Sequence, residues 1–235
     1  MTSEKSIGIL LMLGAIGVLV PYTILTATFN YPDILRQDPG MILAQFHQGG
    51  NTLIFTWLAF ATMGSPLLIA YIMLGRKLET KLPFVRWITT IGVISTIVQM
   101  IGLLRWVFVV PVLAREYVGA TNEATQQSLI TAFTLIHQFA GVLMGEHLGQ
   151  LFTVVWTIGM SYALRKIGII PAWIAWLGFI ASGIYITAQA ELLATIIPGF
   201  PAWEAAGFLG SSLWLIWLVL VGIQLCKPNT SQKFI

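Results

Sequence analysis

The sequence predicts an all-α membrane protein built as a bundle of six transmembrane helices. Of its 235 residues, 57% are hydrophobic and only 9% are charged, whereas soluble domains carry about 25% charged residues. The apolar residues also come in blocks of about 20, the length of helix that crosses a hydrocarbon core about 30 Å thick. Because lipid offers backbone amides no partner, these blocks should be helices.

The six spans follow one another along a single membrane domain, residues 1–235. Two connections are long and apolar, and we expect each to form an outer interfacial helix or an extension of the next span. They are Pro39 to Asn51 and Thr125 to Leu143. The six predicted spans are Ile7 to Phe29, Asn51 to Leu74, Phe84 to Val112, Gly145 to Leu164, Ile170 to Leu192, and Ala205 to Cys226.

Basic residues predict the orientation of the bundle, because short cytoplasmic connections are enriched in lysine and arginine. They cluster before the first span, in two of the connections and after the last span, as Lys5, Arg76 to Arg86, Arg165 with Lys166, and Lys227 with Lys233. The other connections hold only Arg36 and Arg115, together with acidic residues. Both termini should therefore be cytoplasmic. The formal charge of +3 is too small to indicate nucleic-acid binding.

Ionisable residues gather at one depth, near the outer side of the predicted bundle. Arg105 follows Arg86 by 19 residues, and Glu146 precedes Arg165 by 19 residues. At about 1.5 Å per residue, both lie roughly 28 Å from the inner boundary. Charges at such a depth tend to pair and to face the bundle interior, so Arg105 and Glu146 are predicted partners. Gly141, Gly145 and Gly149 recur every four residues beside them, a pattern that lets another helix approach closely.

These residues predict an outward-facing polar pocket that binds a small polar or amphipathic ligand. Arg105 would hold an anionic group, Glu146 would orient Arg105, and the histidines would donate hydrogen bonds or titrate. The predicted lining is Arg105, Glu146, His147, His47, Gln189, Glu191, Gln150 and Tyr185. Expected partners are membrane lipid and this ligand, with a membrane-protein partner or a second copy of the chain as further options.

Other classes of function stay open at this point. No bound cofactor is expected, but His47, His147 and Glu146 would suit zinc in a membrane-embedded enzyme if the packing brought them together. A single b-type haem would need two axial ligands, which His47 with His137 or His147 would supply. An accessory subunit of a membrane complex would need neither. The sequence holds no nucleophile elbow, phosphate-binding loop or dinucleotide-binding motif, and its one cysteine excludes an internal disulfide.

The segment YALRKIGIIPAWIAWLGFIASGIYI, from Tyr162 to Ile186, resembles the bacterial integral-membrane family catalogued as domain of unknown function 4386. The resemblance extends to the closing span, FLGSSLWLIWLVLVGIQL, and to an arginine within the third span, here Arg105 in GLLRWVF. It implies a six-helix bacterial inner-membrane protein. It implies no activity.

Overall fold

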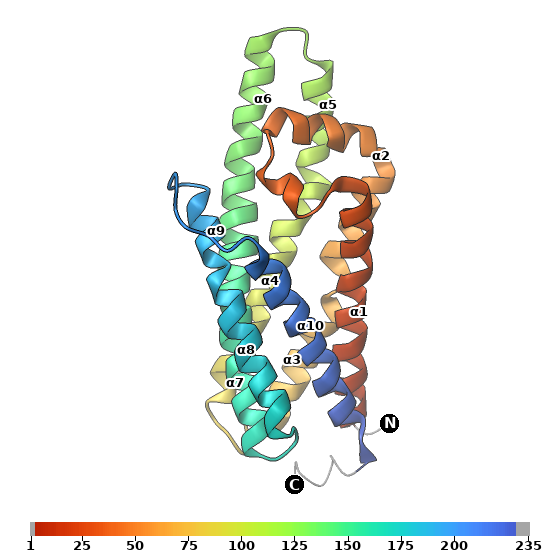
Figure 1. Ribbon diagram of the computed structural model, residues 1–235. Helices are drawn as coiled ribbons and strands as arrows, with labels where there is room; N and C mark the ends of the chain where they lie inside the picture. Colours follow the sequence, from red (N-terminus) through yellow and green to blue (C-terminus); the bar gives the residue numbers. More distant parts are fainter. Residues whose placement is uncertain (1–2, 229–235) are drawn as a thin grey trace. The chain divides into compact units, whose positions relative to one another are not determined.

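A computed structural model describes residues 3–228, so the predicted cytoplasmic Lys233 lies outside the described residues. The described chain is helical throughout and contains no β-strand (Figure 1). Its elements are α1 Ser3–Phe29, η1 Asp33–Arg36, α2 Pro39–Thr62, α3 Ser65–Leu78, α4 Val85–Phe108, α5 Val110–Gly119, α6 Glu123–Ile136, η2 His137–Leu148, α7 Gly149–Lys166, α8 Ala172–Thr187, α9 Gln189–Ala194 and α10 Ala205–Cys226.

Six helical segments in this described part are long and apolar enough to cross a membrane, which confirms the predicted fold class. The last predicted span coincides with α10. The second span is made of the second half of α2 together with α3, and the third combines α4 with the start of α5. The cytoplasmic location of the termini stays a prediction.

The two long connections form helix as expected, in two different ways. The first becomes the initial half of α2, which Asp38 caps by accepting a hydrogen bond from the Met41 amide at 3.0 Å. It ends at Gly50, whose φ of 55° and ψ of −150° break the helix, and Figure 1 shows it running across the direction of α5 and α6. The second becomes α6 and η2, which continue into α7 as one 44-residue segment.

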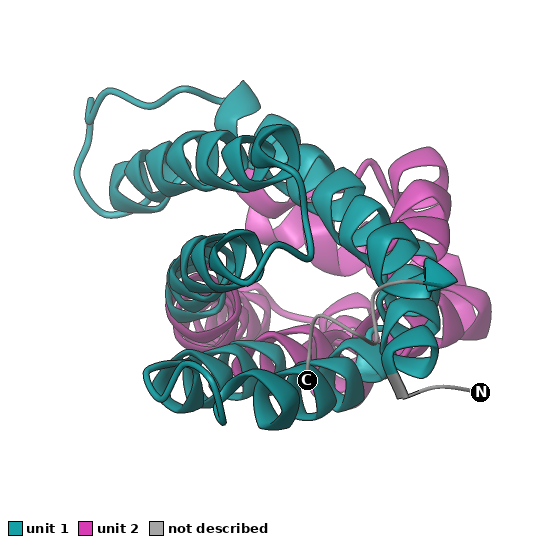
Figure 2. Cartoon of the chain, turned by 90° about the horizontal axis from the view of Figure 1, so that it is seen from below, with its two compact units in different colours: residues 1–16, 64–97, 147–235 teal, residues 17–63, 98–146 magenta. Residues whose placement is uncertain are grey.

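Contacts within the chain divide the described structure into two compact units, coloured separately in Figure 2. Unit 1 contains residues 1–16, 64–97 and 147–235, and unit 2 contains residues 17–63 and 98–146. Each unit therefore combines segments that are far apart in the sequence. That both belong to a single membrane domain stays a prediction.

Unit 1 has a core in which α8 packs against both α7 and α10. Trp156 of α7 stacks on Tyr71 with ring centroids 3.8 Å apart and meets Trp217 of α10 edge-on at 5.7 Å. The start of α1 lies against the end of α10, because a Cβ added to Gly8 would be 2.5 Å from the Gly222 carbonyl oxygen. The start of the first helix and the end of the last helix thus lie side by side in unit 1.

Unit 2 has an aromatic core that surrounds its buried charges. Trp57 of α2 stacks on Trp106 of α4 with centroids 4.8 Å apart, and both side chains are fully buried. Phe29, at the end of α1, meets both indole rings edge-on. Aromatic rings supply large apolar area with defined geometry, so this cluster holds the ends of α1, α2 and α4 together beside Arg105.

Candidate functional site

Arg105 is the buried cation at the centre of the site in unit 2. It lies in the last turn of α4, and only 6% of its surface is exposed. Its Nη1 donates a hydrogen bond to the carbonyl oxygen of Gly102, and its guanidinium lies over the Trp106 ring, 5.1 Å from the centroid. The Arg105 Nε is buried and has no hydrogen-bond partner among the described residues. Part of its donor capacity is therefore unused.

Glycines on the facing segment, η2, make room for this arginine. A Cβ on Gly141 would lie 2.5 Å from Arg105 Nη2, so a side chain there would displace the guanidinium. One turn on, a Cβ on Gly102 of α4 would be 2.7 Å from the Cα of Gly145. The four-residue glycine pattern thus does what the sequence predicts, and η2 approaches α4 closely.

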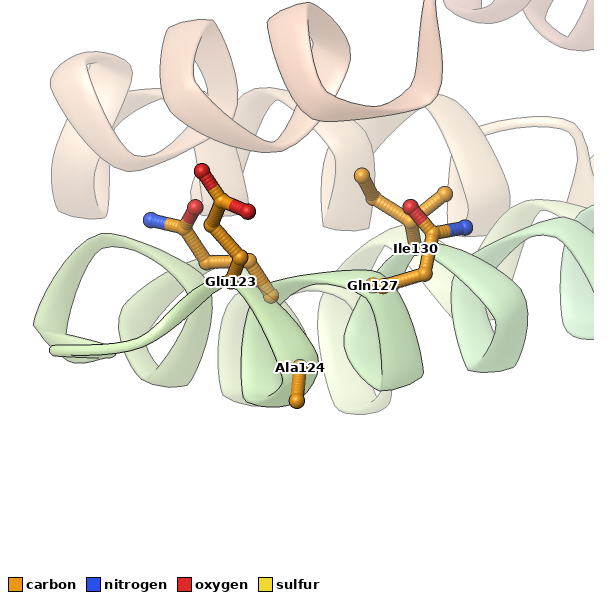
Figure 3. Close-up of a pocket in the computed structure, with 5 residues that line it drawn as sticks. Glu123, Ala124, Gln127 and Ile130 are labelled. Atoms are coloured by element: carbon orange, nitrogen blue, oxygen red, sulfur yellow. The ribbon is translucent and has the colours of Figure 1, made fainter.

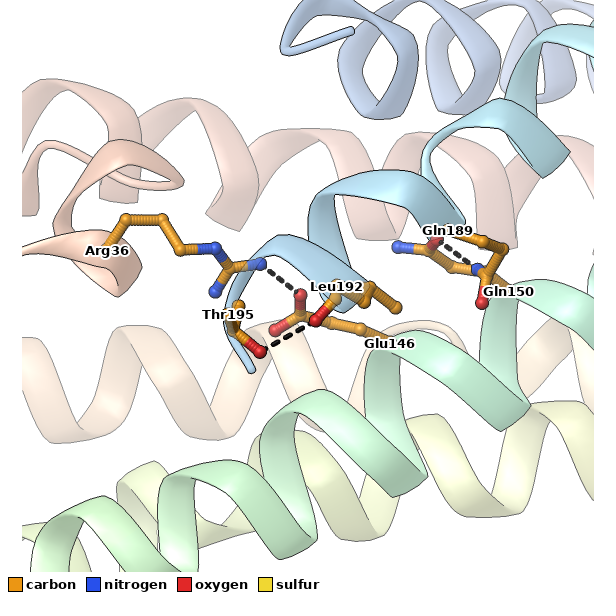
Figure 4. A network of polar contacts seen from close by, with 6 residues as sticks. All are labelled: Arg36, Glu146, Gln150, Gln189, Leu192 and Thr195. Atoms are coloured by element: carbon orange, nitrogen blue, oxygen red, sulfur yellow. Dashed lines mark hydrogen bonds and ion pairs between the residues drawn. The ribbon is translucent and has the colours of Figure 1, made fainter. Parts of the chain in front are cut away.

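Glu146 supplies the carboxylate of the site, but its direct partner is Arg36 of η1. Arg36 Nη2 donates to Glu146 Oε2 at 2.6 Å (Figure 4), and 28% and 19% of the two side chains are exposed. Arg105 is in electrostatic range of both Glu146 and Arg36. The expected association of Arg105 with Glu146 is therefore one of charge, and Arg36 holds the hydrogen-bonded contact.

His137 is a second buried titratable group in unit 2. Its ring stacks on Phe133 at 5.4 Å and meets Trp106 edge-on at 6.2 Å. Only 8% of the residue is exposed. The Leu35 backbone lies beside the ring, but among the described residues no atom meets the geometry of a hydrogen bond to either ring nitrogen. His137 is thus a polar group with unmet hydrogen-bonding capacity, close to two arginines.

Three other predicted site residues come together in unit 1. His147 Nδ1 lies 2.5 Å from Gln189 Oε1, and Gln189 Nε2 donates to Gln150 Oε1 at 3.0 Å, as Figure 4 shows for the two glutamines. Because the Gln189 oxygen can only accept, His147 Nδ1 carries the proton in this arrangement. Tyr185 and Glu191 are both partly exposed in the same unit, and the Tyr185 backbone packs on Gly210.

His47 is a residue of unit 2. It is exposed on the first half of α2, while its neighbour Phe46 is buried, as expected for consecutive residues whose side chains diverge by about 100° around a helix. Among the residues the structure describes, no group of three or more His, Cys, Asp or Glu side chains is placed to hold a metal ion. With His47 exposed and His137 buried among rings, the structure also provides no support for a haem site in unit 2.

A shallow surface depression lies at the start of α6, and none of the predicted site residues lines it (Figure 3). Its lining consists of Glu123, Ala124, Gln126, Gln127 and Ile130. These side chains project from the first two turns or so of an exposed helix, and four of the five are polar or small. The depression has none of the buried charge of the arginine cluster, the group formed by Arg105, Arg36 and Glu146.

Sequence reasoning missed Arg36 as a member of the site, and it did not place His137 in the predicted pocket. Arg36 is in a loop between spans, where charge is expected and carries no signal of its own. One clue was available: Arg36 and Arg115 are the only basic residues in the predicted outer connections. A lone cation on that side is a better candidate for a specific role than one of many.

Comparison with known proteins places the chain in a family without a described activity. No curated protein matches the chain, and no solved structure matches it either. The family model described as domain of unknown function (DUF4386) matches residues 6–222. That match covers nearly the whole chain, including both units and all six membrane-length segments. The protein therefore belongs to the DUF4386 family of helical membrane proteins.

Proposed function

We propose that this protein is a binding protein of the bacterial inner membrane, and that unit 2 binds a small amphipathic molecule with an anionic head at the outer membrane face. One observation carries the proposal. Arg105 is buried in an apolar cluster and shares its one neighbouring carboxylate, Glu146, with a second arginine, Arg36.

Electrostatics favour an anion at this position. A charged side chain at membrane depth is costly unless it is paired, and the Glu146 carboxylate already makes its close contact with Arg36. The charged residues in electrostatic range of Arg105 are that carboxylate and a like charge.

Unused hydrogen-bond donors support the same class of ligand. The Arg105 Nε and the indole nitrogens of Trp57 and Trp106 are buried without a partner among the described residues. Each of these groups can only donate. A carboxylate or phosphate offers several acceptor oxygens, and hydrogen bonds from arginine to such groups are among the strong ones. The aromatic rings around the donors suit the apolar part of an amphipathic molecule.

The exposed side of the Arg36–Glu146 pair supplies the route of entry. Arg36 and Glu146 remain partly exposed, while Arg105 behind them is buried. We propose that the anionic head of the ligand takes the place of the Glu146 carboxylate on Arg36 and comes within reach of Arg105. The binding roles that the sequence predicts for His147, Gln150, Gln189, Glu191 and Tyr185 of unit 1 stay predictions.

Thermal unfolding of the detergent-purified protein tests the proposal, with decyl phosphate as the anionic amphipathic probe. Two control probes separate the contributions of its two parts: inorganic phosphate carries the charge without the decyl chain, and decyl maltoside carries the decyl chain without the charge. A ligand at 100 times its dissociation constant stabilises the folded state by about 2.7 kcal/mol. In a chain of this size, each kcal/mol of stabilisation raises the unfolding temperature by roughly 2–4 °C. We expect decyl phosphate to raise the unfolding temperature more than either other probe does.

Variants of matched charge complete the experiment. Arg105→Gln should abolish the stabilisation by decyl phosphate, whereas Arg115→Gln should retain it, because Arg115 is exposed and contacts its neighbour Glu116. Equal stabilisation of wild type and Arg105→Gln by decyl phosphate would show that the probe binds elsewhere. Failure of decyl phosphate to stabilise the wild type would reject the proposed ligand class.

A further inference from the structure

We infer that ordered water binds in the interior of unit 1, where α7, α8 and α10 bring buried polar groups without partners close to one another. The three helices pack together around α8 (Figure 1). Polar side chains from α7, α8 and α10 meet there in the interior of the unit. The inference is independent of the arginine cluster and its ligand.

Gly178 of α8 marks the centre of the position. A Cβ added to this glycine would lie 2.1 Å from Ser161 Oγ and 2.7 Å from Trp217 Nε1. The serine hydroxyl of α7 and the indole nitrogen of α10 therefore converge on the same backbone atom. Both residues are fully buried, and neither polar atom has a hydrogen-bond partner in the described part of the chain.

Two more hydroxyls lie one helical turn away from this position. Thr157 precedes Ser161 by four residues on α7, and Ser182 follows Gly178 by four residues on α8. Because α7 and α8 are consecutive and packed together with a short connection, they run in opposite directions, and both steps lead the same way along unit 1. Thr157 and Ser182 are also buried, at 1% and 2% exposure, with unpartnered hydroxyls.

Other hydroxyls of this chain show how a helical serine or threonine commonly satisfies its donor. Thr56, Thr62 and Ser128 each donate to the carbonyl oxygen four residues earlier, at 2.7–2.9 Å. This local bond is the usual solution for such side chains in apolar surroundings. Thr157, Ser161 and Ser182 lie within helices where the same carbonyl is within reach, yet their hydroxyls do not use it.

The chemistry of these groups identifies the occupant as water. A buried hydroxyl without a partner loses its hydration and receives nothing in return, so several such groups together would strongly destabilise unit 1. The indole can only donate, whereas the hydroxyls both donate and accept. A small neutral molecule that accepts from Trp217 and exchanges bonds with the hydroxyls satisfies all of them. Buried waters commonly bind two to four such polar groups.

Ser161→Ala tests the inference by the sign of its effect on thermal unfolding. If water bridges Ser161, removing the hydroxyl breaks real hydrogen bonds and should lower the unfolding temperature by about 2–4 °C. If the position is empty, the substitution removes an unsatisfied polar group, and the temperature should stay unchanged or rise. An unchanged or higher temperature overturns the inference.

Two further variants guard the interpretation. Ser211→Ala is the matched control, because the Ser211 hydroxyl of the same unit is satisfied by the Gly207 carbonyl at 2.7 Å, and it should change the temperature less than Ser161→Ala. Combining Ser161→Ala with Trp217→Phe should lower the temperature by less than the sum of the two single effects, since both side chains bind the same water. Strict additivity in this double-mutant cycle would also overturn the inference.

Discussion

Substituting Gly102 by alanine tests the close approach of α4 and η2 on which the Arg105 site depends. The added methyl would lie 2.7 Å from the Cα of Gly145 and 2.8 Å from the carbonyl oxygen of Ala140, whereas carbon contacts are normally about 3.5–4.0 Å. Both obstructing atoms belong to the backbone, so no side chain can rotate away. The helix and η2 must separate by nearly 1 Å.

The expected magnitude follows from two opposing contributions. Overpacking costs up to about 3 kcal/mol in the free energy of unfolding, while alanine is better than glycine by about 1 kcal/mol within a helix. The net loss of about 2 kcal/mol corresponds to a decrease of about 4–8 °C in the unfolding temperature at this chain length. Detergent-solubilised protein, heated while tryptophan fluorescence is recorded, provides the measurement.

Two other glycines provide a graded control. Gly145→Ala should be milder, because its Cβ would lie 3.3 Å from Gly102 Cα. Gly183→Ala should be neutral or stabilising, because its Cβ would meet nothing within 4 Å. If Gly102→Ala unfolds at the temperature of Gly183→Ala, the helices are not in tight contact and the reasoning is refuted.

Two further substitutions test local features of the structure. Glu4→Ala removes the buried carboxylate that pairs with Lys77 and should reduce the free energy of unfolding by about 1–3 kcal/mol. The control, Arg115→Ala, breaks an exposed pair and should reduce it by less than about 1 kcal/mol. Equal losses of the two variants in chemical denaturation would contradict the burial of Glu4. Asn122→Ala removes the side-chain acceptor that caps α6 through the Thr125 amide at 2.8 Å and should reduce the free energy of unfolding by about 1 kcal/mol. We expect faster amide hydrogen exchange, confined to the first turn of α6. Unchanged exchange there would show that the cap contributes nothing.

The spans were predictable because hydropathy alone selects them in a membrane. The predicted last span has the bounds of α10, and the helical character of both long connections also followed from their apolar composition. Local geometry was less accessible. The π-helical winding of η2 was not predicted, because apolar composition locates a span without setting how the backbone winds within it.

The polar residues of the site were predictable as a class, but their pairing was not. Counting residues from basic anchors places Arg105 and Glu146 at one depth, and the structure puts them in electrostatic range. The contact of Glu146 with Arg36 depends on where the chain goes after Phe29, through a turn that includes Asn30 at a φ of 51°. His47 illustrates the converse: its depth suits the site, but its position around the helix leaves it exposed.

The break at Gly50 lets the two halves of α2 run in different directions. Its φ and ψ fall in a region open essentially only to glycine, although no neighbouring atom lies within 4 Å of the missing side chain. The steric freedom of one residue therefore sets the heading of the Pro39–Gly49 segment without constraining the bilayer-crossing half. A residue other than glycine at position 50 would hold this φ and ψ only under strain, so the direction of the segment that follows Arg36 and the Asp38 cap depends on this one glycine.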